Sequence, residues 1–205
     1  MLRKTWAGLV AAAGLLVGNV ALAQISGTDH DFSGDGFSGG EICVVCHAPH
    51  NNVANVTGAP LWNHEVTTAV FTLYTSTSFD ATDITQPDGQ SKLCLSCHDG
   101  TVAVDNFGGT TTGTTFVTGN ALLDTNLGND HPISFTYDSA LATVDTELED
   151  PSTATSGLGS TIDADMLFGG SLECASCHDV HDNTVVPFLR VSNAGSGLCL
   201  TCHIK

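Results

Sequence analysis

All eight cysteines of this 205-residue chain fall into four Cys-x-x-Cys pairs, and a histidine directly follows each pair. Cys-x-x-Cys-His is the attachment sequence of c-type haem, in which both thiols bond to one porphyrin. The adjacent histidine then binds the iron as its proximal ligand. The pattern therefore predicts four covalent c-type haems. The attachment cysteines are Cys43, Cys46, Cys94, Cys97, Cys174, Cys177, Cys199 and Cys202, and the proximal ligands are His47, His98, His178 and His203.

Three other uses of Cys-x-x-Cys pairs explain this pattern less well. Zinc ribbons have no need of a histidine directly after every pair. Disulfides across a two-residue loop would brace nothing larger than that loop. A thioredoxin-like redox motif normally occurs once in a chain. Haem attachment is the reading that uses every cysteine and the histidine beside it.

Five further histidines are available as second, distal ligands of the predicted irons: His30, His50, His64, His131 and His181. His50 and His181 each lie three residues after a proximal histidine. At that distance the ring can turn away from its own haem and reach the iron of a neighbour. Histidine–histidine ligation of all four irons is therefore possible by count.

An internal repeat orders the remaining candidates. Motifs one and three share C-x-x-C-H-x-x-H, and motifs two and four share Leu-Cys-Leu-Ser/Thr-Cys-His. The chain reads as one two-haem module used twice, over about 24–104 and 130–205. An Asp-His pair precedes each module, which favours His30 and His131 as the remaining ligands and leaves His64 as the alternative.

The first 23 residues have the features of a secretory signal peptide. Arg3 and Lys4 are followed by an apolar run over 6–20, and Ala21-Leu22-Ala23 supplies small residues for cleavage. The apolar run is shorter than the roughly 20 residues of a membrane span. We therefore expect a secreted, extracellular or cell-surface protein, alternatively a periplasmic one, with no membrane insertion after cleavage.

Composition restricts both partners and fold. Beyond the signal, the chain has 3 Lys and Arg against 22 Asp and Glu, a net charge of −19, which disfavours binding to nucleic acid.

Aromatic residues are only 6 % of the chain, so haem faces must supply much of the core. The sequence predicts a single domain over 24–205, mostly irregular coil with short helices and few short strands organised around the haems. A Thr/Gly/Asp-rich segment, 105–129, joins the modules, and 138–170 is again irregular. Ser91, Ser171 and Ser196 are expected N-caps of the motif helices.

Several longer stretches resemble the extracellular tetrahaem cytochromes that polymerise into nanowires (the OmcE type) and the wider group of doubled-CxxCH multihaem cytochromes. The stretches that carry this resemblance are 43–51, 60–63, 91–103, 129–132 and 197–203. The resemblance implies coil-rich subunits with histidine–histidine haems stacked through a filament, and an axial ligand contributed by a neighbouring subunit. His30, close to the predicted mature N-terminus, is our candidate for that ligand in a head-to-tail assembly.

Electron transfer by closely stacked haems is the function that these features favour, in an extracellular filament that conducts electrons out of the cell. Redox partner cytochromes are the expected partners besides other copies of the chain. The alternative is a soluble periplasmic tetrahaem shuttle. A haem reductase fits less well, since five spare histidines for four irons leave no iron open to a substrate. We therefore expect an electron-transfer protein without a catalytic residue, not an enzyme.

Overall fold

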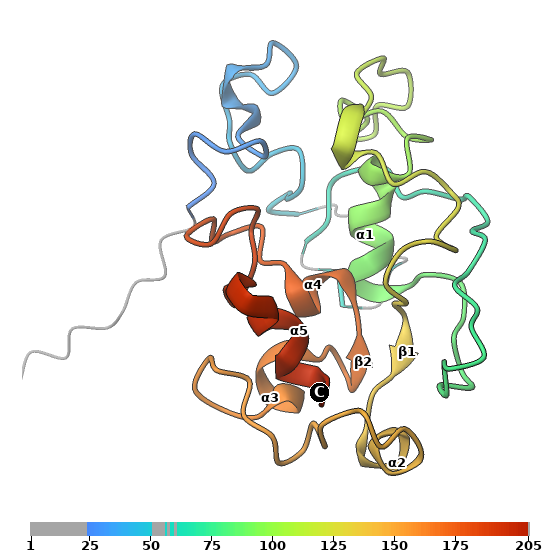
Figure 1. The fold of residues 1–205 in the computed structure, drawn as a ribbon. Coiled ribbons are helices and arrows are strands. Elements are labelled where there is room, and N and C mark those ends of the chain that lie inside the picture. Colours follow the sequence, from blue (N-terminus) through green and yellow to red (C-terminus); the bar gives the residue numbers. More distant parts are fainter. Residues whose placement is uncertain (1–23, 51–55, 57, 60, 205) are drawn as a thin grey trace, which may run out of the picture.

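The computed structural model describes residues 24–50, 56, 58, 59 and 61–204 (Figure 1). The predicted signal peptide lies outside the described residues. Helices, strands and 3-10 turns in this part of the chain are short and widely spaced. In order they are η1 (Phe32–Gly34), α1 (Gly89–His98), η2 (Gly119–Ala121), β1 (Phe135–Thr136), α2 (Ser139–Val144), α3 (Ile162–Met166), β2 (Ser171–Leu172), α4 (Cys174–Cys177), η3 (Ala194–Ser196) and α5 (Gly197–Cys202).

The helices that carry Cys-x-x-Cys motifs begin differently from the prediction. Asp88 is the N-cap of α1, while Ser91 lies inside its first turn. Ser171 belongs to β2, and Glu173 is the N-cap of α4. Ser196 does precede α5, but its side chain makes no capping hydrogen bond. The prediction was wrong for Ser91 and Ser171 because their hydroxyl or backbone groups are used in contacts between distant segments.

A two-stranded antiparallel sheet joins the middle of the chain to its last third. Phe135 of β1 pairs with Leu172 of β2, and Thr136 pairs with Ser171. β2 ends at Leu172, and the single residue Glu173 joins it to α4. In Figure 1, β1 and β2 lie below α1 and α4, which places motif three beside motif two.

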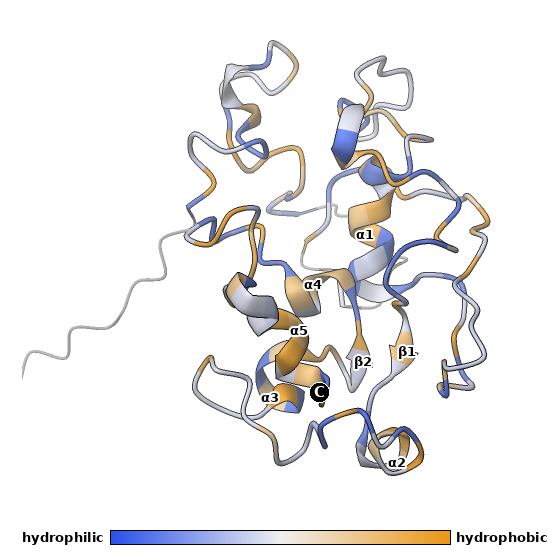
Figure 2. Ribbon diagram, in the orientation of Figure 1, coloured by the Kyte–Doolittle hydropathy of each residue, from blue (hydrophilic) through white to orange (hydrophobic). Residues whose placement is uncertain are grey.

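The hydrophobic core is small and divided. The larger cluster packs the sheet against α3, and its buried members are Phe135, Tyr137, Ile162, Met166, Leu167 and Leu172. A second cluster joins Leu95 of α1 to Phe71 and Leu127. In Figure 2 hydrophobic residues gather on α3, α4, α5 and part of α1, whereas much of the connecting chain is hydrophilic. The described chain is therefore mostly coil with short helices and one small sheet, as the sequence predicts.

The two segments expected to be irregular differ from each other. Within 105–129 the structure has η2 and otherwise no helix or named strand. Within 138–170 it has two helices, α2 and α3. Asp138 caps α2 by accepting a hydrogen bond from Leu141 N, and Thr161 caps α3 by accepting one from Ala164 N. The prediction of an irregular 138–170 was therefore too simple.

We expect Ile162→Ala to reduce the free energy of unfolding by about 2–5 kcal/mol, because it opens a cavity in the larger core cluster. The Ile162 side chain is completely buried there. Chemical denaturation of the haem-loaded protein measures the effect. Val144→Ala is the control, since Val144 is 68 % exposed and its truncation should change stability little. Equal effects of the two variants would show that this cluster does not support the fold.

Candidate haem centres

Each Cys-x-x-Cys-His segment is closed into one helical turn by its own backbone. The N–H of His47 donates to Cys43 O at 2.8 Å, although motif one lies outside any named helix. In motifs three and four, the corresponding bonds from His178 and His203 are 3.1 and 2.9 Å long. Motif two lies wholly within α1. One turn of helix places both thiols of a pair on the same side, as attachment to one porphyrin requires.

The proximal histidines of motifs one, three and four leave their turns in extended conformation. Each forms an antiparallel bridge with another segment: His47 with Trp62, His178 with Leu189 and His203 with Leu148. His98 instead remains in α1, and its Nδ1 donates to Ala121 O at 2.7 Å. Every motif histidine is thus fixed by chain outside its own motif.

Five of the eight thiols are in surroundings that raise their pKa and favour an uncharged sulfur, whereas the pKa of Cys174 is lowered. Burial raises the pKa of Cys46 to about 11, the pKa of Cys97 to about 12 and the pKa of Cys202 to about 11. Reactive thiols and zinc ligands require a thiolate, which a lowered pKa favours. A thioether sulfur carries no charge, so these surroundings suit covalent haem attachment better than thiol redox chemistry.

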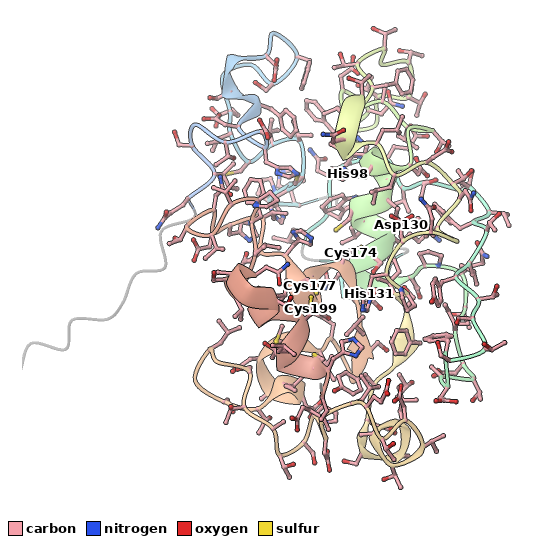
Figure 3. The ribbon with its side chains drawn as sticks, in the orientation of Figure 1. His98, Asp130, His131, Cys174, Cys177 and Cys199 are labelled. Atoms are coloured by element: carbon pink, nitrogen blue, oxygen red, sulfur yellow. The ribbon has the colours of Figure 1, made fainter. Side chains whose placement is uncertain are left out.

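Consecutive motifs are neighbours in space. Cys46 lies close enough to Cys97 to contribute to the raised pKa of that thiol, which relates motifs one and two. Cys94 and Cys174 lie on the contacting helices α1 and α4 and affect each other's pKa, which relates motifs two and three. Cys177 contributes to the raised pKa of Cys202, which relates motifs three and four. In Figure 3, Cys174 and Cys177 lie between α1 and Cys199 of α5.

Three predicted distal histidines face three motif histidines across similar gaps. The ring centroids of His30 and His98 are 6.0 Å apart, and those of His181 and His47 are also 6.0 Å apart. The rings of His131 and His203 are separated by 6.3 Å. Each distal ring therefore comes from a segment remote from the motif it faces.

These separations match the width of a histidine–histidine metal centre. A bond from metal to imidazole nitrogen is about 2.0–2.1 Å long, and with a ring radius of about 1.1 Å two opposed imidazoles have centroids about 6.3 Å apart. Rings in direct aromatic contact also fall within 4.5–7 Å, so the chemical identity of the partners matters here. In all three cases the partner is the histidine of an attachment motif. The residues present therefore fit haem.

Backbone carbonyls orient several of these rings. His131 Nδ1 lies 2.9 Å from Pro132 O, and His178 Nδ1 lies 3.1 Å from Pro187 O. A carbonyl only accepts hydrogen bonds, so Nδ1 carries the proton and Nε2 keeps a lone pair. Metal-binding histidines characteristically donate their other N–H to such a group. The same arrangement holds His98 through Ala121.

His30 is enclosed by side chains of its own chain. Its ring lies 4.9 Å from that of Phe188 and 6.3 Å from that of Phe32. Burial lowers the pKa of His30, and the nearby His98 lowers it further. Its buried Nδ1 has no hydrogen-bond partner within the described residues. A neutral imidazole with a buried, unpartnered nitrogen fits the role of a metal ligand.

His64 has different surroundings. It is fully buried, its Nδ1 lies 2.7 Å from Glu65 O, and its Nε2 lies 2.9 Å from Ala103 O. Both ring nitrogens therefore face backbone carbonyls. Its ring contacts Trp62 at 6.3 Å between centroids. This environment favours a structural histidine, and His30 is better placed than His64 to serve as a ligand.

The fourth predicted distal ligand, His50, is exposed at the end of the described range 24–50. The ring contacts just described do not assign it to His178, the remaining motif histidine. Its role therefore stays a prediction.

Apolar side chains near motif four are open to solvent: Leu200 is 45 % exposed and Ile204 is 47 % exposed. Such exposed apolar surface beside an attachment motif fits a haem face.

Sequence reasoning missed the groups that orient the rings. The carbonyls of Ala121, Pro132 and Pro187 carry no side-chain signal, so no sequence pattern could have identified them. Phe188 was also missed, although an aromatic residue near a motif is a weak indication of ring packing. Arg190 was overlooked too: its Nε donates to Ala175 O, which holds the segment after motif three against α4.

Comparison with known families adds one match. Residues 168–205 match the family model described as the doubled CXXCH motif. The match supports a multihaem c-type cytochrome. Its motifs indicate covalently bound c-type haem and a role in electron transfer rather than catalysis. A comparison with curated proteins found no match. Within the described residues, no helix is long and apolar enough to cross a membrane.

We expect His131→Ala to convert the haem attached at motif four from low-spin to high-spin iron, because the iron loses one of two strong-field nitrogen ligands. Optical and electron paramagnetic resonance spectra of the oxidised protein measure the change. His64→Ala is the matched control and should leave every haem low-spin. A high-spin signal in the His64 variant with none in the His131 variant would reverse the assignment.

Proposed function

We propose that the chain carries four c-type haems, one on each Cys-x-x-Cys-His motif, and transfers single electrons along them. The observation that carries this proposal is the set of three histidine pairs, each formed by a motif histidine and a remote histidine at 6.0–6.3 Å between ring centroids. Ligation by two histidines leaves no iron position open to a substrate, which favours electron transfer over catalysis.

The pairing extends to the fourth centre by the internal repeat. His181, three residues after the motif-three histidine, faces His47 of motif one. His50 stands at the same distance after His47. Reciprocal exchange would therefore place His50 on the iron bound by His178. Motifs one and three would then hold their haems as an interlocked pair.

The haem iron supplies the one-electron redox chemistry when it is bound. The residues of the chain fix its ligands and its surroundings. Nδ1 of His98, His131 and His178 donates to backbone carbonyls, which keeps each Nε2 directed toward the iron site. Rigid ligands reduce the structural change that accompanies electron transfer, because no side chain must rotate when the iron changes charge.

The proposal includes export and assembly. We infer that residues 1–23 are cleaved and that the mature chain, with its net charge of −19, works outside the cytoplasm. Cys43 and Cys199, in the first and last motifs, are both exposed. Exposed terminal motifs suit contact between the last haem of one chain and the first haem of the next, as in a head-to-tail filament. His30 already faces His98 of its own chain, so we assign it to that chain rather than to a neighbouring subunit.

We expect His50→Ala to leave one iron high-spin while all four haems remain covalently attached. Mass spectrometry of the intact protein counts the haems, and resonance Raman spectra report the spin state. His64→Ala again serves as the control. Unchanged low-spin spectra in the His50 variant would mean that another group, from this chain or from a neighbouring copy, occupies the distal position at His178.

Electron microscopy of native material tests the assembly. We expect filaments whose subunits repeat head to tail, with continuous haem density across the junctions. Spectra of purified filaments should show entirely low-spin iron. Discrete single molecules under the same conditions would overturn the filament and favour a soluble carrier, whereas fewer than four haems per chain would overturn the proposed function itself.

A further inference from the structure

The buried carboxylate of Glu173 joins the two helices that carry motifs two and three. Glu173 is only 6 % exposed, and its Oε2 accepts a hydrogen bond from Ser91 N at 3.3 Å. In return, the hydroxyl of Ser91 accepts a hydrogen bond from Cys174 N at 2.9 Å. Each helix therefore receives at its N-terminus a side-chain acceptor from the other helix. We name this pair of contacts the Ser91–Glu173 clasp.

The clasp satisfies groups that a helix end otherwise leaves unpaired. The N–H of Ser91 lies in the first turn of α1, and the N–H of Cys174 begins α4, so neither has an acceptor within its own helix. A carboxylate at the start of α1 also interacts favourably with the helix dipole. Ser134 donates its hydroxyl to the same Oε2 at 3.1 Å, which ties in the segment that leads to β1.

The clasp lies next to Cys94 and Cys174, two cysteines predicted to carry haem, so it can affect electron transfer between those haems. Cys174 is held through its own backbone N–H, and Cys94 lies one helical turn after Ser91 on α1. The two helices that carry these thiols, α1 and α4, contact each other. Figure 3 shows Cys174 at the side of α1. The clasp therefore lies directly beside the predicted attachment points of the second and third haems.

Local backbone geometry permits this close approach. Gly89, the first residue of α1, has φ +52°, and a Cβ placed there would lie 3.5 Å from Glu173 Oε1. Most other side chains would be strained in this left-handed conformation. Ser91, Ser176 and Glu173 are all buried, and Glu173 N donates to Ser176 Oγ at 2.9 Å. Ser176 thus fixes the backbone of Glu173, while Ser91 and Ser134 fix one oxygen of its carboxylate.

We propose that Glu173 and Ser91 are positioning residues for electron transfer between the second and third haems, and so between the two-haem modules. This inference rests on the proposed function. The clasp would hold Cys94 and Cys174, and with them the haems attached there, at a fixed separation. Neither residue needs to touch a haem to do this, because both act through the backbone of the helices that bear the cysteines.

Circular dichroism in the Soret region provides the test, because closely spaced haems give exciton couplets that depend steeply on their separation and angle. We expect Ser91→Ala and Glu173→Ala to lose the couplet of the second and third haems and to slow electron redistribution after pulse reduction. All haems should stay attached and low-spin. Glu173→Gln should retain the wild-type couplet, since both donors to Glu173 use a single oxygen that an amide oxygen can replace.

Ser156→Ala is the matched control. Ser156 is 1 % exposed and its hydroxyl also bonds a carboxylate, that of Asp165, but it lies outside the clasp. This variant should lose stability without changing the couplet. Unchanged couplets and redistribution rates in Ser91→Ala would overturn the inference, even if Glu173→Ala failed to fold. Haem counts on the wild-type protein are measured first, so a chain with fewer than four haems would be recognised as a failure of the proposed function.

Discussion

Pairs of facing imidazoles connect parts of the chain that its small core does not hold together. His30 precedes motif one yet faces the histidine of motif two, and His181 follows motif three yet faces the histidine of motif one. The second of these pairs joins the two sequence modules, whereas the first lies within the first module. An iron bound between two such rings acts as a cross-link, and its binding free energy becomes part of the folding free energy. This explains how a chain with short helices and a two-stranded sheet can have a defined structure.

The chemistry of the candidate centres could be predicted from the sequence because it resides in side chains at fixed spacing. Closing the turn in Cys43–His47 or Cys199–His203 depends only on local backbone bonds. The favoured distal residue His131 followed from the repeat, and the structure brings it to motif four. What the sequence did not reveal was which motif each distal histidine faces. That depends on the path of the whole chain.

The errors concern groups whose role depends on a distant partner. Ser91 is a residue type favoured at N-caps, but it lies within α1, and its hydroxyl accepts a hydrogen bond from Cys174 N, at the start of α4. Asp138 and Thr161 do cap helices in the usual local way, and their short helices were overlooked because the surrounding Thr, Gly and Asp residues obscure the periodicity. Local capping rules thus succeed only when both partners belong to one segment.

Exposure along the series of motifs is uneven in a way that suits electron transfer. The cysteines of the outer motifs include the exposed Cys43 and Cys199, whereas Cys94 and Cys174 are only partly exposed and lie on the contacting helices α1 and α4. Electrons must enter and leave at motifs that partners can approach. The separation between motifs two and three, inside the chain, must stay constant. The Ser91–Glu173 clasp, which uses buried hydrogen bonds, meets the second requirement at the point where the modules join. The net negative charge of the chain favours basic or counter-ion-bridged partners, since like charges repel on approach.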